Sequence, residues 1–318
     1  MARVQVHVGL VKTGTTTLQQ SFAHARGPLA VRGVRYPGNA LNHRASAREL
    51  VRSSRFAGGV ERVLGEVGPG ESVLLSSEAF STIATSPKAD PEDRARYLDR
   101  LRARLAGHDV EIILVLRRPD ALLEAAYAET ILSSPNAPPF RAFLKARRQR
   151  FDLAGQLRLW EERFEVKTLI FEELCAKGLV QAFWKALDLG DPPSVPAPVR
   201  LTPPPAAIAW LRRAKRAGAM SPQERKRRWL FLRQDENAPH FEREGGFWRS
   251  ARQREAAIAR CLGGLDPGRF PPSAPLAPRL QWSDADHAAV EAAFLDWQRA
   301  YRGWIASREA AKIPPYQG

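Results

Sequence analysis

Short apolar runs alternate with helical patterns over the first 190 residues of the chain. The runs that predict strands are six or seven residues long and are bounded by turn or helix signals. They are Val4–Gly9, Ser72–Ser77, Val110–Leu116 and Val166–Phe171. Helical spacing is found between them, at Thr15–Ala25, after Asp90-Pro91, after Pro119 and over Phe151–Phe164. This alternation predicts an α/β fold, in which a parallel sheet is flanked by crossover helices.

The segment from Asp90 to Leu116 carries the clearest of these signals. Asp90-Pro91 places a capping residue before a proline at the first helical position, which marks the start of a helix. Leu98, Leu101 and Leu105 then share one helical face. Val110–Leu116 is apolar on both faces after its first two residues, so we expect a central parallel strand there.

The composition changes near Asp191. Seven prolines between positions 192 and 205 disfavour regular structure, and beyond them the pattern is helical only. A last helix is predicted from a cap at Ser283, and it carries an aromatic-rich stripe that should pack against a neighbour. The stripe consists of Val290, Phe294, Trp297, Tyr301 and Trp304. We therefore expect residues 1–190 to form an α/β core, and residues 191–318 to form a Pro-rich connection and a helical appendage or lid of the same domain.

The overall composition narrows the class of protein. With 318 residues, 44% of them hydrophobic and 26% charged, the chain has the composition of an ordinary globular protein. Cys175 and Cys261 cannot form a disulfide framework, and neither has a second Cys or a His at metal-ligand spacing, so we expect no metal. No signal-peptide pattern and no run of roughly 20 apolar residues is visible, so we expect a cytoplasmic protein.

The segment after the first predicted strand reads Gly9-Leu-Val-Lys12-Thr13-Gly14-Thr15-Thr16-Thr17. A strand, a Gly-containing loop with a lysine and then a helix can cradle a phosphate-like anion. Loop amides and the helix N-terminus point at such a ligand, and the lysine adds a full positive charge. A nucleoside-triphosphate P-loop has its Lys after the second Gly, whereas here Lys12 precedes Gly14. We therefore expect a P-loop-like anion site without the Walker order, and the alternative is a turn with a solvent-exposed Lys.

The run Lys12-Thr13-Gly14-Thr15-Thr16-Thr17 resembles the 5′-phosphosulfate loop of a known family. The family is that of the sulfotransferases that use 3′-phosphoadenosine 5′-phosphosulfate (PAPS), particularly its bacterial and glycan-type branch. The resemblance covers about residues 1–190. It implies transfer of a sulfuryl group from PAPS to a hydroxyl or amine of a glycan, a lipid head group or a small metabolite. It also implies that Lys12 stabilises the leaving phosphate, and that Thr13, Gly14 and the three threonines after it hold the donor.

A second segment agrees with this resemblance. The strongest predicted strand ends at Leu116-Arg117, where the family carries the Arg that binds the 3′-phosphate, so Arg117 is the candidate for that contact. The family places a Ser eight residues further on, but this chain has Ala125 there. The loss of one neutral hydrogen bond costs about 1 kcal/mol. We therefore expect the 3′-phosphate to be held more weakly or by other groups.

Sulfuryl transfer also requires a base, and two residues are candidates. Glu78 ends the second predicted strand, and ligands of open α/β sheets lie outside the carboxyl ends of strands. Relatives in the glycan-type branch use a Glu in a similar segment, and the alternative for Glu78 is an acid that favours a helix dipole. His43 lies in a predicted loop, and an imidazole with its unperturbed pKa of about 6.5 suits proton transfer. The alternative for His43 is an incidental polar residue, and His7 is expected to pack within the first strand.

The chain is strongly basic. Forty-nine Lys and Arg against 34 Asp and Glu give a net charge of +15 and a pI of about 10.5. The excess gathers at 141–150 and 212–233, which fits either a solvated face or a surface that attracts the nucleotide donor and an anionic acceptor. No recognised nucleic-acid motif accompanies it, so a nucleic acid is not the expected partner. The competing functions are a basic nucleotide- or nucleic-acid-binding protein without transferase activity and a kinase-like phosphotransferase.

Overall fold

The computed structural model describes residues 1–37, 64–65, 67–68, 70–85, 91–147, 149–192, 202–218 and 220–310. The chain divides into two compact units, each made of three separate stretches. The sheet unit consists of Met1–Leu122, Ala146–Arg200 and Ala257–Ser273. The helical unit consists of Leu123–Lys145, Leu201–Ala256 and Ala274–Gly318. Helices α7 (Pro119–Ser133) and α14 (Ala251–Leu262) pass from one unit to the other. The expected division at residue 190 stays a prediction.

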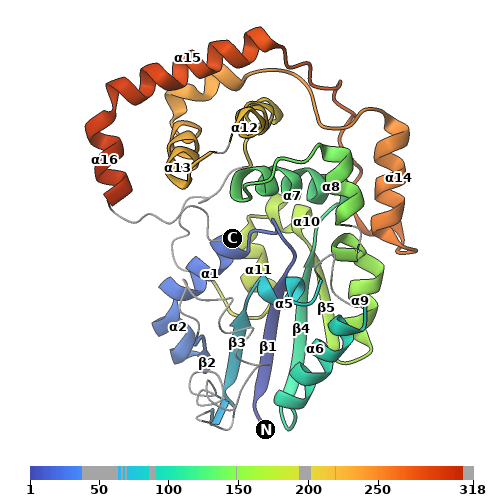
Figure 1. Cartoon of the computed structure of the whole chain (residues 1–318). Coiled ribbons are helices and arrows are strands. Elements are labelled where there is room, and N and C mark those ends of the chain that lie inside the picture. Colours follow the sequence, from blue (N-terminus) through green and yellow to red (C-terminus); the bar gives the residue numbers. More distant parts are fainter. Residues whose placement is uncertain are drawn as a thin grey trace. The chain divides into compact units, whose positions relative to one another are not determined.

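In the described part of the chain, five parallel strands form the sheet (Figure 1), in the order β2-β3-β1-β4-β5. They are β1 (Arg3–Gly9), β2 (Val34–Arg35), β3 (Ser72–Ser76), β4 (Asp109–Leu116) and β5 (Glu165–Ile170). The predicted α/β class, with a parallel sheet flanked by helices, is confirmed. All five carboxyl ends lie along one edge because the strands are parallel. The chain leaves β1 toward β2 and leaves β3 toward β4 on the other side, which makes the carboxyl end of β1 a topological switch point.

The side chains of β1 alternate between the two faces of the sheet. His7 is fully buried, and its Nδ1 lies 2.8 Å from Oγ of Ser76 on β3. Its ring packs on Phe183, with the two ring centroids 4.7 Å apart. The prediction that His7 packs within the sheet is confirmed.

Helices cover both faces of the sheet. The face that bears His7 is covered by α1 (Thr15–His24), α2 (Arg26–Val31), α10 (Phe171–Ala176) and α11 (Leu179–Ala186). Their apolar side chains form one buried cluster with Leu74, Ile113 and Val115 of the strands. The other face is covered by α6 (Pro91–Arg104) and α9 (Leu153–Glu161), as Figure 1 shows. Leu98, Leu101 and Leu105 of α6 are buried, as their spacing predicts.

Some elements of the sheet unit differ from the expected pattern. β2 has only two residues, which is too short for any periodicity to show. The helix expected over Phe151–Phe164 is shorter, because a 3-10 turn (Gln149–Phe151) precedes it and it ends at Glu161. Asp152 sets the start of α9, since its carboxylate accepts a hydrogen bond from the amide of Gly155 at 2.9 Å.

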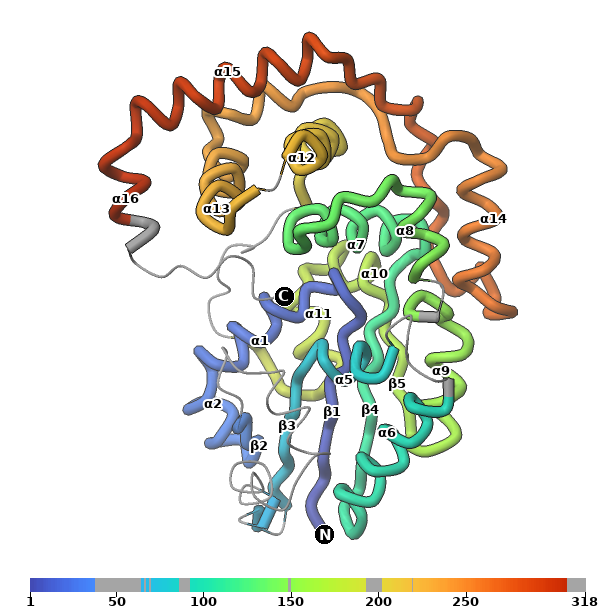
Figure 2. Tube along the Cα trace, viewed as in Figure 1, coloured from blue at the N-terminus to red at the C-terminus, as the bar shows by residue number. Residues whose placement is uncertain are grey.

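The helical unit has an aromatic core. It contains α8 (Phe140–Ala146), α12 (Pro205–Ala217), α13 (Pro222–Phe231), a 3-10 segment (Asp235–Phe241) and α15 (Asp284–Ala300), whose path Figure 2 traces. Phe294 of α15 lies with its ring centroid 5.5 Å from Trp210 and 5.5 Å from Phe231. The buried guanidinium of Arg228 stacks on Trp210 at 4.8 Å and forms an ion pair with Glu291 at 2.5 Å, so this one charge is neutralised within the core.

The last predicted helix begins at Ser283 as expected, where a capping box joins Ser283 and Asp286. It ends earlier than its aromatic stripe suggests, because Tyr301 is its C-cap and a separate helix, α16 (Arg302–Ala310), follows. Val290, Phe294 and Trp297 are buried, whereas Tyr301 is 40% exposed. The stripe therefore continues across a break between two helices.

Candidate functional site

The loop of residues 10–14 joins the carboxyl end of β1 to α1, and it lies at the switch point of the sheet. Gly9 precedes it and is closely packed, since a Cβ at this position would lie 2.0 Å from Oγ1 of Thr15. The carbonyl oxygen of Gly9 accepts a hydrogen bond from Oγ of Ser81 at 2.9 Å. Only glycine therefore allows the strand to end this close to the first turn of α1.

The backbone of this loop has an unusual handedness. Lys12 has φ 65° and Gly14 has φ 72°, so two left-handed residues flank Thr13. Such alternation turns successive amide groups toward one side and makes a concave nest for an anion. Gly14 is also required sterically, because a Cβ there would lie 2.4 Å from Cδ2 of Leu179. At Lys12, however, a side chain occupies a conformation that costs roughly 1–2 kcal/mol, which points to a functional reason for its presence.

The threonines of the motif divide into two groups. Thr13 is fully buried and donates a hydrogen bond from Oγ1 to the carbonyl of Leu10 at 2.7 Å. Thr15 is 5% exposed, and its Oγ1 lies 3.5 Å from Oγ1 of Thr13. These two hydroxyls hold the loop. Thr16 and Thr17 are half-buried at the N-terminus of α1. The first helical bond runs from the amide of Leu18 to the carbonyl of Gly14, so the amides of residues 15–17 are available to an anion.

Arg117 directly follows β4 and reaches the same loop. Its Nη1 donates a hydrogen bond to the carbonyl oxygen of Lys12 at 2.6 Å, and its guanidinium lies 4.9 Å from the ring centroid of Phe171. Glu172 lies 3.7 Å from its Nε and also accepts a hydrogen bond from the amide of Arg118 at 3.1 Å. The structure therefore brings together Lys12 and Arg117, which sequence analysis assigned to the two ends of one nucleotide.

Ala125 lies in α7 and is 2% exposed. The resemblance predicts a hydroxyl at this position, whereas the chain has a methyl group that packs inside the protein. Any additional contact with a 3′-phosphate would therefore have to come from another residue.

Of the two base candidates, the structure describes one. Glu78 follows β3 and is the N-cap of the short helix α5 (Ala79–Thr82), with a half-buried side chain. Its carbonyl oxygen accepts a hydrogen bond from Oγ of Ser81 at 2.8 Å, and the same hydroxyl bonds to Gly9. The turn that carries Glu78 is thus tied to the end of β1. His43 lies outside the described residues.

Two residues that position this site were not predicted. Ser81 links the turn after β3 to the end of β1, and Glu172 links the start of α10 to the residues after β4. The only sequence signal for them is their place just beyond predicted strands, which also describes many residues without a role. Within the described ranges there is no cluster of His, Cys, Asp or Glu that could bind a metal ion. Nor does any helix there have the length and apolarity needed to cross a bilayer.

Comparison with known proteins gives matches at the level of structure only. No protein-family model matches the sequence, and no curated protein matches it significantly. Among solved structures, the sulfotransferase domain from the curacin biosynthetic pathway is 16% identical, with a TM-score of 0.33 over 63% of this chain and 79% of that one. Mouse sulfotransferase SULT7A1, solved with PAP, is 13% identical, with a TM-score of 0.39 over 84% of this chain and 87% of that one. These scores are low, so the case for a function rests on the residues of the chain itself.

Proposed function

We propose that this protein is a PAPS-dependent sulfotransferase. The observation that carries the proposal is the β1–α1 loop, where Lys12 and Gly14 are both left-handed, Thr13 is locked between them and Arg117 holds the carbonyl of Lys12. The loop and Arg117 lie at the carboxyl edge of the sheet, where an open α/β fold binds its ligands. The motif order Lys-Thr-Gly-Thr-Thr favours a phosphosulfate over a nucleoside triphosphate.

The chemistry assigned to these residues follows from the charge that develops during transfer. The acceptor oxygen or nitrogen attacks sulfur, the bond between sulfur and the bridging phosphate oxygen breaks, and its electron pair stays on 3′-phosphoadenosine 5′-phosphate (PAP). The ammonium of Lys12 and the amides at the N-terminus of α1 stabilise that developing charge. Arg117 provides a cation for the 3′-phosphate, and its bond to Lys12 couples the two phosphate sites.

The acceptor must lose a proton, which passes to a base. Glu78 is the described candidate, because its turn is linked through Ser81 to the end of β1. His43 is the second candidate and stays a prediction. The proposed acceptors are hydroxyls or amines of a glycan, a lipid head group or a small metabolite, and a cytoplasmic location stays a prediction as well.

Ligand-dependent thermal stability tests the donor assignment. A ligand present at 100 times its dissociation constant stabilises the folded state by about 2.7 kcal/mol. PAP is expected to raise the melting temperature far more than AMP or ATP, because only PAP carries both a 3′- and a 5′-phosphate. Stabilisation by ATP without stabilisation by PAP would refute the proposal and favour a kinase-like phosphotransferase.

One observation favours a second candidate. Ala125 removes a hydroxyl that the family uses at the 3′-phosphate, which fits a protein that binds a nucleotide without transferring a group. Incubation with PAPS and a panel of glycan, lipid and small-molecule acceptors separates the two. Binding of PAP together with no transfer to any acceptor class would support the second candidate.

A further inference from the structure

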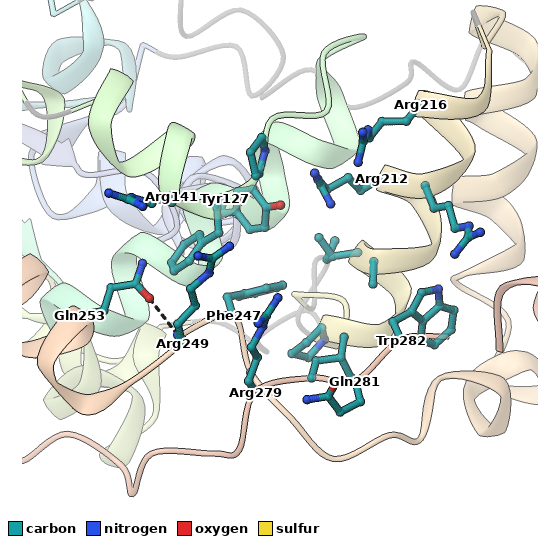
Figure 3. A pocket seen from close by; sticks show the side chains of 18 of the residues that line it. Tyr127, Arg141, Arg212, Arg216, Phe247, Arg249, Gln253, Arg279, Gln281 and Trp282 are labelled. Carbon is teal, nitrogen blue, oxygen red and sulfur yellow. Dashed lines mark hydrogen bonds between the residues drawn. The ribbon is translucent and has the colours of Figure 1, made fainter. Parts of the chain in front are cut away.

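A cavity of about 700 Å³ in the helical unit opens beside α8 and α12 (Figure 3). The described residues that line it include six arginines: Arg141, Arg212, Arg213, Arg216, Arg249 and Arg279. They come from α8, from α12 and from the two segments that precede α14 and α15. None of the described residues that line it is an Asp or a Glu. Residues far apart in the sequence thus place six positive charges around one space.

Most of these arginines have no ion-pair partner among the residues that the structure describes. Arg213 forms an ion pair with Asp284, which is not a lining residue. In the described part of the chain, no carboxylate forms an ion pair with Arg141, Arg216, Arg249 or Arg279. Guanidinium groups of like charge around one cavity repel one another, and an anion that enters between them removes this repulsion. The cavity is therefore electrostatically complementary to a ligand with several negative charges.

The wall between the arginines is aromatic. The ring centroid of Tyr127 lies 4.9 Å from that of Phe140 and 5.0 Å from that of Phe247, so the three rings form one packed surface. Figure 3 shows Tyr127 and Phe247 with arginine side chains around them. Aromatic faces pack against flat or apolar molecular bodies. The ligand that fits this lining has an organic body as well as anionic groups.

The cavity wall is held by polar contacts inside the helical unit. Arg212 donates a hydrogen bond from Nε to the carbonyl of Pro138 at 3.3 Å, and the hydroxyl of Tyr127 donates to the same oxygen at 3.1 Å. Nζ of Lys215 caps the C-terminal end of α7 by donating to the carbonyls of Ile131 and Ser134. These contacts fix the arginine-bearing face of α12 against α7, and a site that is already formed loses less entropy on binding.

We propose that this cavity binds a small organic polyanion, that is, a ring-shaped or apolar molecule bearing at least two carboxylate, sulfate or phosphate groups. Arginine forks match the planar or tetrahedral oxygens of these groups in a bidentate manner. The volume falls within the roughly 300–1,000 Å³ of small-molecule sites, which favours a molecule of about disaccharide size over a polymer. That this ligand is the acceptor for transfer rests on the proposed function.

Isothermal titration calorimetry of the full chain tests the site directly. The probes are a sulfated disaccharide of uronic acid and glucosamine, inositol hexakisphosphate as a phosphate-based polyanion, and chitobiose as a neutral disaccharide. The two polyanions should bind, and their binding should weaken as salt is added. Chitobiose should not bind. The tighter of the two shows which anion the arginines prefer. Equal binding of chitobiose would overturn the proposal.

Paired double variants locate the binding. Arg249→Ala/Arg279→Ala removes two lining charges, and Arg158→Ala/Arg252→Ala removes two exposed arginines that do not line the cavity. The first pair should raise the Kd for the polyanion roughly tenfold or more per arginine, which is the loss expected for a charge-assisted hydrogen bond. The control pair, with the same change in net charge, should leave it nearly unchanged. Equal losses in both pairs would overturn the site.

The same variants separate this site from the proposed donor site. Lys12→Ala should weaken PAP binding and leave the Kd for the polyanion unchanged, while Arg249→Ala/Arg279→Ala should raise the Kd for the polyanion and leave PAP binding unchanged. Displacement of the disaccharide by PAP would overturn the proposal, because the cavity would then belong to the donor. Displacement by a short oligothymidylate that binds more tightly would overturn it in favour of a nucleic acid. If PAP does not bind at all but the polyanion does, the site stands and only its role as an acceptor site falls.

Discussion

The guanidinium of Arg117 donates a hydrogen bond to the main-chain carbonyl of Lys12, with 2.6 Å between Nη1 and the oxygen. The two residues are 105 positions apart in sequence and meet because each follows one of two paired strands, β1 and β4. The bond fixes the peptide that follows Lys12, and therefore the left-handed turn on which Lys12 stands. A residue expected at the 3′-phosphate thus also shapes the loop expected at the 5′-phosphosulfate.

Replacement of Arg117 tests this coupling. Arg117→Ala removes both the cation and the bond to Lys12, and hydrogen bonds to charged groups are worth about 1.5–3 kcal/mol. We therefore expect the Kd for PAP to rise about 10- to 100-fold. AMP, which lacks the 3′-phosphate, should also bind more weakly because the loop is loosened. Titration calorimetry with both nucleotides measures this, and an AMP affinity equal to that of the wild type would show that the bond does not support the loop.

Two variants of Lys12 separate the effect of its charge from the effect of its left-handed backbone. Lys12→Ala removes the ammonium and keeps the Cβ in a left-handed conformation, whereas Lys12→Gly removes both. Transfer should be abolished in both variants, because neither can stabilise the leaving phosphate. The glycine variant should be more stable than the alanine variant by about 1 kcal/mol. Urea unfolding and a PAPS turnover assay check the two effects, and turnover near the wild-type rate in either variant would contradict the role given to Lys12.

The steric need for Gly9 gives a stability prediction with a matched control. A Cβ at Gly9 would lie 2.0 Å from Oγ1 of Thr15, whereas a Cβ at Gly27 in α2 would have no atom within 4 Å. Gly9→Ala should therefore destabilise the fold by about 1–3 kcal/mol through overpacking and weaken PAP binding as Thr15 moves. Gly27→Ala should be neutral or stabilise by about 0.5–1 kcal/mol, since Gly is a poor helix former. Chemical denaturation of the two variants gives the comparison, and equal stabilities would contradict the packing described.

Part of this fold can be predicted from the sequence, because some of its elements depend only on residues that are neighbours in the chain. Runs such as Val110–Leu116 predict strands because burial on both faces requires continuous apolar residues. Ser283 marks a helix start because capping uses neighbouring residues only. The two-residue strand β2 has no such signature, since its pairing with β3 depends on the rest of the sheet.

In the candidate site, too, some residues are predicted from local sequence and others are placed only by the fold. Lys12 and Arg117 are predicted from short motifs, whereas Ser81 and Glu172 act through contacts that only the folded chain creates. The cavity of the helical unit could not be predicted either. Arg249 and Arg279 lie outside the basic stretches at 141–150 and 212–233, and it is the fold that assembles residues from all of these segments. A run of charge in a sequence does not show whether the charges face solvent or one another.

Replacement of Glu78 and of His43 tests which residue is the base. Glu78→Gln keeps the size of the side chain and removes its ability to accept a proton. If Glu78 is the base, kcat should fall by about 10²–10⁴ while the Kd for PAP changes little, because the donor phosphates are held elsewhere. His43→Ala should then keep kcat within a few-fold of the wild type. The opposite pattern would assign the base to His43, and unchanged rates in both variants would reject both residues.

The buried amine of Lys215 makes the stability of the fold depend on pH. Burial and, to a smaller extent, the positive charge of Arg225 lower the pKa of Lys215 from its usual 10.5 to about 8. Below pH 8 the amine is protonated in both the folded and the unfolded protein. Between pH 8 and 10.5 the unfolded chain binds the proton and the folded chain does not. The contribution of Lys215 to stability therefore rises with pH across this window.

Comparison with Lys215→Met isolates this effect. Tyrosines and cysteines that titrate in the same range are present in both proteins, so their contributions to the pH dependence of stability cancel. The free energy of unfolding of the wild type, relative to the variant, should increase by roughly 1–2 kcal/mol between pH 8 and pH 10 after allowance for partial exposure. Urea unfolding at pH 7, 8, 9 and 10 measures the difference. A constant difference across the series would mean that the ammonium of Lys215 is as well solvated in the folded protein as in the unfolded one. The amine could not then be held between the carbonyls of Ile131 and Ser134 as a buried cap of α7.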